Sequence, residues 1–249
     1  MKIATVNVRR EPYYRRGSVE MGLKRLGYTV GSYTRPLGKD SILVLWNKKR
    51  GAEEQAADRW EAQGGIVLVM ENGYLSKVDK SHYAISVHGH NGSGWFPVGT
   101  EDRFTPLGFP IKDWRKGGSE VLVRAQRGVG SVLMASPPQW AEKLVAKLKA
   151  RKVNARLILH PGNFSPKVPP VIDMRNAIEM HIWCSAMGVL ALTEGIPVKH
   201  HAPHWICAGA EREVALHRAA HGQWRHEEIA SGEPFARILD NLKDVPKWK

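Results

Sequence analysis

The stretch RLILHPGN, residues 156–163, decides the fold that the sequence predicts. Its apolar part, LIL, is typical of a short strand buried in a sheet. The strand ends abruptly in His160, Pro161, Gly162 and Asn163, which add nothing to a hydrophobic core. In an open parallel sheet, ligands bind beyond the carboxyl ends of the strands. A polar turn at this position therefore predicts a binding cleft at the end of the strand.

Apolar runs and amphipathic stretches alternate on both sides of this strand. The first half has expected strands at residues 3–8, 41–46, 66–70 and 82–87 and helices at 17–28 and 52–65. The second half has expected strands at residues 120–127, 155–159, 177–183 and 196–200 and helices at 137–152 and 185–195, followed by a helical tail. Strands separated by helices form parallel sheets with right-handed crossovers. The predicted fold class is α/β, with two Rossmann-like parallel-sheet halves facing a cleft. The loop-rich residues 89–118 separate an N-terminal domain at 1–116 from a C-terminal domain at 117–249.

The composition is basic and lacks membrane signals. The 249 residues include 37 Lys and Arg against 24 Asp and Glu, a formal net charge of +13. Such a charge favours polyanionic partners, nucleic acid above all, although a solvated basic surface is the alternative. Two cysteines in apolar surroundings are typical of reduced thiols. No apolar run reaches the roughly 18 residues of a membrane span, and the N-terminus lacks a signal sequence, so we expect a cytoplasmic protein without a membrane partner.

Polar residues that follow the second-half strands are candidates for binding an anion. The loop QRGVGS offers backbone N–H groups and Arg127, with Gly128 at its turn. Ser185, Ala186 and Met187 begin an expected helix, and helix N-termini attract anions. Glycine loops often only turn the chain, and Ser185 is equally suited to cap its helix.

These features together resemble a known family. The strand with its His-Pro turn, the helix start at Ser185 and the Gly-Ile-Pro-Val of residues 195–198 resemble the C-terminal half of GT-B glycosyltransferases, including the His-Pro type of bacterial polysaccharide transferases. The first half, with VLVMENGYL and GHNGSG, resembles the N-terminal half of small phage-encoded proteins related to glycosyltransferases that modify hydroxymethylated DNA bases. The likeness spans most of the chain, and its more specific parts are residues 156–163 and 183–198.

The resemblance implies a nucleotide-sugar donor bound by the second half, with a UDP-sugar favoured and no further cofactor required. The donor-binding residues that it implies are Arg127, Gly128, His160, Gly162, Ser185, Ala186 and Met187. One position departs from the family pattern. Many GT-B enzymes carry a glutamate five residues before the glycine of the G-x-P turn, where it holds the donor ribose, and here that position is Leu190. Glu194 instead stands next to Gly195, so the identity of the nucleotide stays open.

Transfer of a sugar to a hydroxyl requires a base near the acceptor oxygen. Among Glu71, His88 and His90, we take His90 and Glu71 as the catalytic candidates, because both stand in polar turns beside asparagine or glycine. Histidine suits neutral pH, whereas Glu71 needs a raised pKa or has only a positioning role. Either residue could equally be structural.

Basic residues after the first two expected strands border the same cleft. They are Arg9, Arg10, Arg15, Arg16, Lys48, Lys49 and Arg50. Such residues bind phosphates without sequence preference, and Tyr13 nearby could stack on an extruded base. The leading hypothesis is a metal-independent enzyme that transfers a sugar to 5-hydroxymethylcytosine, or another hydroxymethylated pyrimidine, in duplex DNA. The alternatives are a transferase acting on a polysaccharide or glycan, a non-catalytic nucleic-acid-binding protein and an epimerase of the same fold.

No metal site is expected from the sequence. The chain contains no Asp-x-Asp, the ligand pair of the other large transferase fold. The histidine-rich run HHAPHWIC, residues 200–207, matches no zinc spacing, so we interpret it as a structural group at a strand end.

Overall fold

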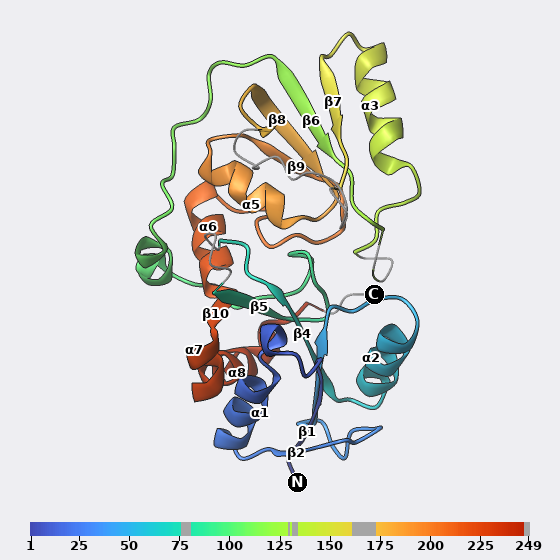
Figure 1. The fold of residues 1–249 in the computed structure, drawn as a ribbon, viewed down its shortest axis with the longest axis vertical. Coiled ribbons are helices and arrows are strands. Elements are labelled where there is room, and N and C mark those ends of the chain that lie inside the picture. The colour runs from blue at the N-terminus through green and yellow to red at the C-terminus, as the bar shows by residue number, and fades with distance from the viewer. Residues whose placement is uncertain (76–80, 129, 131–133, 161–172, 247–249) are drawn as a thin grey trace.

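The computed structural model describes residues 1–75, 81–128, 130, 134–160 and 173–246. Gly162 lies outside the described residues. The chain forms a six-stranded sheet with the order β10-β5-β4-β3-β1-β2 and a four-stranded sheet with the order β7-β6-β8-β9. Figure 1 shows the second sheet above the first, with the long connection through residues 98–118 running along one side. The predicted α/β class with two sheets is confirmed.

The centre of the first sheet is parallel and covered on both faces. Its parallel strands are β1 (Ile3–Asn7), β2 (Thr29–Gly31), β3 (Ile42–Trp46) and β4 (Ile66–Asn72). One face packs against α1 (Arg16–Arg25) through Val19 and Leu23, and the other against α2 (Ala52–Ala62) through Trp60. Because both faces are buried, β3 and residues 66–70 of β4 are continuously apolar rather than alternating. The short edge strand β2 was not predicted.

The strand β5 (His82–Val87) differs from the prediction, which took the first-half strands as parallel. It pairs antiparallel with β4, so that Val87 lies opposite Leu68 and far from the carboxyl end of β4. Residues 88–95 therefore fold back, and Val87 pairs with Trp95. This returning loop, and not a parallel strand end, carries His90 and Asn91 towards the second sheet.

The second sheet is parallel throughout its described strands. These are β6 (Glu120–Arg124), β7 (Ala155–Ile158), β8 (Ala177–Ile182) and β9 (Val198–His200). Alternate residues of β6 face opposite sides: Val123 packs under α3 (Trp140–Ala150), whereas Leu122 joins the core that includes α5 (Ala186–Thr193). The carboxyl ends of β6, β7 and β8 face the first sheet.

The C-terminal tail returns to the first sheet. The tail consists of α6 (Arg212–His221), β10 (Gln223–Arg225), α7 (His226–Ser231) and α8 (Glu233–Asp240). Strand β10 pairs with β5 at the edge of the first sheet, and Trp224 is buried there beneath the guanidinium of Arg103. Helix α7 approaches α1 so closely that a Cβ atom on Gly22 would lie 2.0 Å from the carbonyl oxygen of Ile229. Residues 223–245 thus belong structurally to the first half.

Short 3-10 helices complete the described structure, at Pro12–Tyr14, Glu101–Arg103, Thr105–Leu107 and Leu242–Asp244. Among the described residues, no helix has both the length and the apolar character needed to cross a bilayer.

Candidate active site

A cleft of about 1160 Å³ opens between the facing ends of the two sheets. The first-sheet wall consists of the lining residues Asn7, Val8, Arg9, Arg10, Tyr14, Arg16, Trp46, Asn47, Lys49, Glu53, Asn72, His90 and Asn91. The second-sheet wall consists of Arg124, Ala125, Gln126, Arg127, His160, Cys184, Ser185, Ala186 and Met187. Both walls lie where β1, β3, β4, β6, β7 and β8 end, which is the place that parallel sheets offer to ligands.

Part of the predicted basic set lines the first-sheet wall: Arg9, Arg10, Arg16 and Lys49. Arg16 is held by an ion pair with Glu20 at 2.6 Å. The guanidinium of Arg9 lies over the ring of Tyr14, 5.6 Å from its centroid. Arg10 and Lys49 form no ion pair within the part of the chain that the structure describes. These two cations are therefore available to a ligand.

The other predicted DNA-binding residues lie outside the lining. Lys48 is buried, with its Nζ 3.3 Å from Asp58 Oδ1. The Nε of Arg15 donates to the Tyr83 hydroxyl at 3.3 Å, and that of Arg50 donates to the Gly130 carbonyl at 3.1 Å. Tyr13 donates its hydroxyl proton to the side-chain oxygen of Asn72. All four side chains thus have partners within the protein.

The predicted donor residues gather on the second-sheet wall. The Nε of Arg127 donates to His160 Nδ1 at 3.2 Å, and burial, followed by the charges of Arg127 and Arg124, lowers the pKa of His160. Ser185 begins α5, where its hydroxyl accepts the N–H of Met187 at 3.2 Å. Ala186 lines the cleft beside them, whereas Gly128 does not, and Gly162 is outside the described residues.

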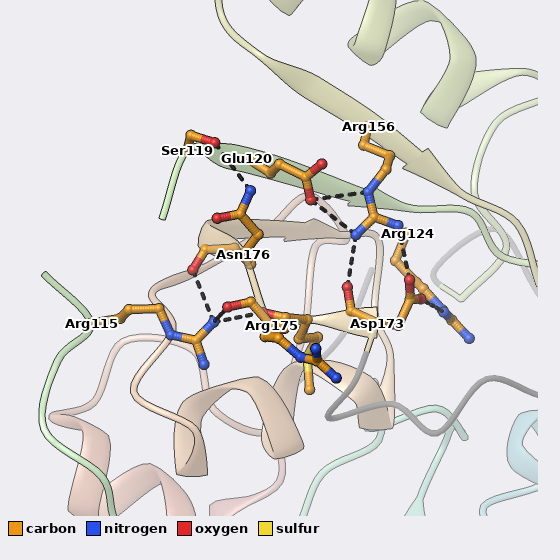
Figure 2. A network of polar contacts seen from close by, with 10 residues as sticks. Arg115, Ser119, Glu120, Arg124, Arg156, Asp173, Arg175 and Asn176 are labelled. Carbon is orange, nitrogen blue, oxygen red and sulfur yellow. Dashed lines mark hydrogen bonds and ion pairs between the residues drawn. The ribbon is translucent and has the colours of Figure 1, made fainter. Parts of the chain in front are cut away.

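Arg124 also lines this wall, and the sequence analysis did not single it out. It lies at the end of β6, which is shorter than predicted, with its side chain 15% exposed. Its Nη1 lies 3.7 Å from Asp173, which makes a closer 2.8 Å contact with Arg156 (Figure 2). No hydrogen bond from Arg124 to another described residue is present, so its guanidinium retains free donors towards the cleft. Its position, two residues before the QRGVGS loop, was the signal in the sequence that could have identified it as a cleft residue.

Gln126 joins the strand ends of the second sheet. Its Oε1 accepts the N–H of Cys184 at 2.7 Å, and its Nε2 donates to the Met134 carbonyl at 3.4 Å. The Cys184 thiol is fully buried, which raises its pKa to about 12 and keeps it protonated at neutral pH. These contacts fix the ends of β6 and β8 relative to each other.

Glu71 lies directly behind the first-sheet wall. Its Oε1 accepts the hydroxyl of Tyr74 at 2.6 Å and the N–H of Gly92 at 3.3 Å. Burial raises the pKa of Glu71 to about 7, against the opposing effect of these hydrogen bonds and one from the Asn91 backbone. The carboxyl thus supports the loop that carries Asn91, and its proton equilibrium lies in the range that acid–base chemistry at neutral pH requires.

His90 is the other catalytic candidate, and it lines the cleft while only 3% exposed. Burial, with a smaller effect of the Lys49 charge, lowers its pKa to about 4. The imidazole is therefore neutral at physiological pH.

Side chains of the histidine-rich run at residues 200–207 make contacts within the protein. His201 Nε2 lies 2.8 Å from His181 Nδ1, and His181 Nε2 lies 2.8 Å from Glu179 Oε1. The Cys207 thiol donates to the Ala215 carbonyl. Within the described ranges, no group of three or more His, Cys, Asp or Glu side chains is arranged to hold a metal ion.

Two solved structures of KpsC from Thermosulfurimonas dismutans are similar to this chain. The β-Kdo 2,7-transferase matches with a TM-score of 0.56 and 12% identity, over 95% of this chain and 100% of that chain. The β-Kdo 2,4-transferase matches with a TM-score of 0.53 and 13% identity, over 89% of this chain and 92% of that chain. The fold is that of GT-B glycosyltransferases. No protein-family model and no curated protein matches the sequence.

The structure also places the two residues that were compared with the ribose-binding glutamate of GT-B enzymes. Leu190 is half-buried in α5. The carboxylate of Glu194 pairs with Lys112 Nζ at 2.6 Å. Lys112 belongs to the connection between the two halves, so Glu194 has a role in joining that segment to α5.

Proposed function

We propose that this chain is a glycosyltransferase that moves a sugar from a nucleotide-sugar donor to a hydroxyl of an anionic acceptor. The observation that carries the proposal is the cleft between two facing sheets in a GT-B fold, lined by cations on both walls. The second-sheet wall, with Arg124, Arg127 and the beginning of α5, suits the phosphates of the donor. Glu53 is the single acidic residue in the lining that the structure describes, so a second anionic ligand meets little repulsion.

The preferred acceptor is an acidic glycan. Two observations support it: the structural neighbours are Kdo transferases, and Arg9, Arg10 and Lys49 line the first-sheet wall. A carboxylate or phosphate on the acceptor would pair with these side chains. The departing phosphate would be stabilised from the opposite wall, where charge develops as the bond to the sugar breaks.

Hydroxymethylated duplex DNA is a second candidate acceptor. The same three cations suit DNA phosphates, and the aromatic rings of Tyr14 and Trp46 line the first-sheet wall beside them. Four of the eight residues first assigned to DNA contact, namely Tyr13, Arg15, Lys48 and Arg50, are outside the lining, which places this acceptor second.

The decisive experiment is a transfer assay read by mass. The protein is incubated with UDP-, GDP- or CMP-activated sugars and either acidic oligosaccharides or duplex DNA containing 5-hydroxymethylcytosine, with and without a chelator. We expect one acceptor to gain the mass of a single sugar residue. We expect the same product when the chelator is present. Sugar-nucleotide turnover without any acceptor would indicate an epimerase or hydrolase. Nucleic-acid binding without nucleotide binding or turnover would contradict the transferase proposal.

A further inference from the structure

His90 is held in one orientation by contacts from both halves of the molecule. Its backbone N–H donates to the sulfur of Met134 at 3.1 Å, and its carbonyl accepts the hydroxyl of Ser93 at 2.6 Å. Gly130 packs against the ring edge, because a Cβ atom placed there would lie 3.1 Å from His90 Cε1. The imidazole therefore sits where the first-sheet wall meets the QRGVGS loop of the second half.

The hydrogen bond to the ring determines which nitrogen carries the proton. The backbone N–H of Lys48 points at His90 Nδ1 with a distance of 3.1 Å. A peptide N–H is only a donor, so Nδ1 must be the unprotonated acceptor. In the neutral ring the proton then resides on Nε2. Adding a second proton would break the Lys48 contact and create a charge in a buried place near the Lys49 ammonium.

The Nε2 atom has no hydrogen-bond partner among the described residues, although the side chain is only 3% exposed. This atom is not fully enclosed by the protein either. Since His90 lines the cleft, this N–H opens into it. An almost fully buried donor that faces a cavity indicates a ligand oxygen at that place.

We propose that His90 is a fixed Nε2–H donor to a phosphate oxygen of the nucleotide-sugar donor, and not the base of the reaction. This inference rests on the proposed function. The contact of its ring with Gly130 places it on the donor side of the cleft, near the wall that carries Arg124 and Arg127. As the bond between the sugar carbon and this phosphate breaks, negative charge grows on the phosphate oxygens, and a preorganised N–H stabilises it. The proton of the acceptor hydroxyl must go to another group. Glu71, the other first-half candidate, lies behind the cleft wall and would receive this proton only through a group that lines the cleft.

Nitrogen NMR tests the tautomer in the wild-type protein without requiring turnover. The side chains of the 11 histidines are labelled with 15N, and His90 is assigned from the signal missing in His90→Gln. His226→Gln, at the exposed start of α7, is the control for the assignment. We expect an unprotonated Nδ1 and a protonated Nε2 from about pH 5 to pH 8, an interval in which an ordinary histidine titrates. Addition of UDP, GDP or CMP should shift the Nε2–H signal. A proton on Nδ1, or titration near neutral pH, overturns the inference, as does nucleotide binding that leaves Nε2–H unchanged.

Kinetics separate a donor from a base. Glutamine places an amide N–H near the position of Nε2 but cannot accept a proton at neutral pH. We expect kcat of His90→Gln to be at least about tenfold above that of His90→Ala, with the wild-type pH profile retained, as for loss of one hydrogen bond to a charged group. Equally low residual activity of both variants, with a pH profile that no longer falls at acidic pH, would show that His90 is the base. If the wild type transfers no sugar, the proposed function fails, while the NMR result still decides the tautomer and the phosphate contact.

Discussion

The two walls of the cleft differ in how firmly their polar groups are held. On the second-sheet wall, Arg127 contacts His160, Gln126 holds Cys184, and Ser185 caps α5. On the first-sheet wall, Arg10 and Lys49 have no ion-pair partner in the described part of the chain. A preorganised wall suits a ligand that is the same in every turnover, whereas loosely held cations suit a longer or more variable anion. Under the proposed function, this difference favours the second sheet for the donor and the first sheet for the acceptor.

The largest effect that we expect concerns Glu71, the buried carboxyl behind the first-sheet wall. The pKa of Glu71 is about 7 in the folded protein against an ordinary value of 4.5. A folded pKa above the unfolded value means that folding favours the protonated form. The native state of the wild type therefore loses stability as pH rises from 4.5 through 7, and a difference of 2.5 pKa units corresponds to about 3 kcal/mol.

Glu71→Gln removes this ionisation but keeps an oxygen that can accept from Tyr74 and Gly92. Its stability relative to the wild type should increase with pH between about 4.5 and 7 and then level off, by up to about 3 kcal/mol. Urea denaturation at several pH values measures the difference. A difference between the two proteins that is independent of pH would show that Glu71 is not titrating in this range.

The second effect tests the preorganised wall. In Arg124→Gln, Asp173 retains its 2.8 Å contact with Arg156, so the fold should survive while a partly buried positive charge is lost from the cleft. We expect kcat/KM for the nucleotide sugar to fall about 100-fold, the range of one charge-assisted contact in a desolvated site. Arg127→Gln should lower it only about tenfold, since Arg127 is exposed and solvent screens its charge.

Arg151→Gln, at the end of α3 and outside the cleft, is the matched control for both substitutions. Equal activity of Arg124→Gln and the control would show that the donor does not bind at this wall.

The comparison of the walls also shows what the sequence could reveal. The His-Pro turn and the alternating pattern predict the two sheets and the cleft, because period and strand-end polarity are local properties. The antiparallel direction of β5 and the return of β10 to the first sheet are not local, since pairing partners are set by long-range packing. The same limit applies to single side chains. Lys48 and Lys49 are neighbours in sequence, yet one is buried against Asp58 and the other lines the cleft.

The third effect tests the loosely held wall. Replacing both Arg10 and Lys49 by glutamine should raise KM for an anionic acceptor about tenfold while kcat and donor KM change little, because cations in contact with solvent contribute mainly attraction and on-rate. The wild-type KM should rise with salt, and this dependence should weaken in the double variant. A KM that is insensitive to salt in the wild type would favour a neutral acceptor and would contradict the assignment of this wall.

The smallest effect concerns Arg16, which lines the same wall but is already paired. Its Nε lies 2.6 Å from Glu20, one helical turn further along α1, and its Nη1 donates to the Val8 carbonyl at 3.2 Å. Arg16→Gln should lower the free energy of unfolding by only about 0.3–0.5 kcal/mol, the usual contribution of an i,i+4 pair on a helix surface. Acceptor KM should change less than twofold, because a cation that is neutralised by Glu20 attracts an anion weakly. An increase in KM as large as that of the Arg10 and Lys49 double variant would show that the Glu20 pair opens on binding. Free cations would then no longer distinguish the first-sheet wall, and the contrast between the walls would rest on Arg124 and Arg127 alone.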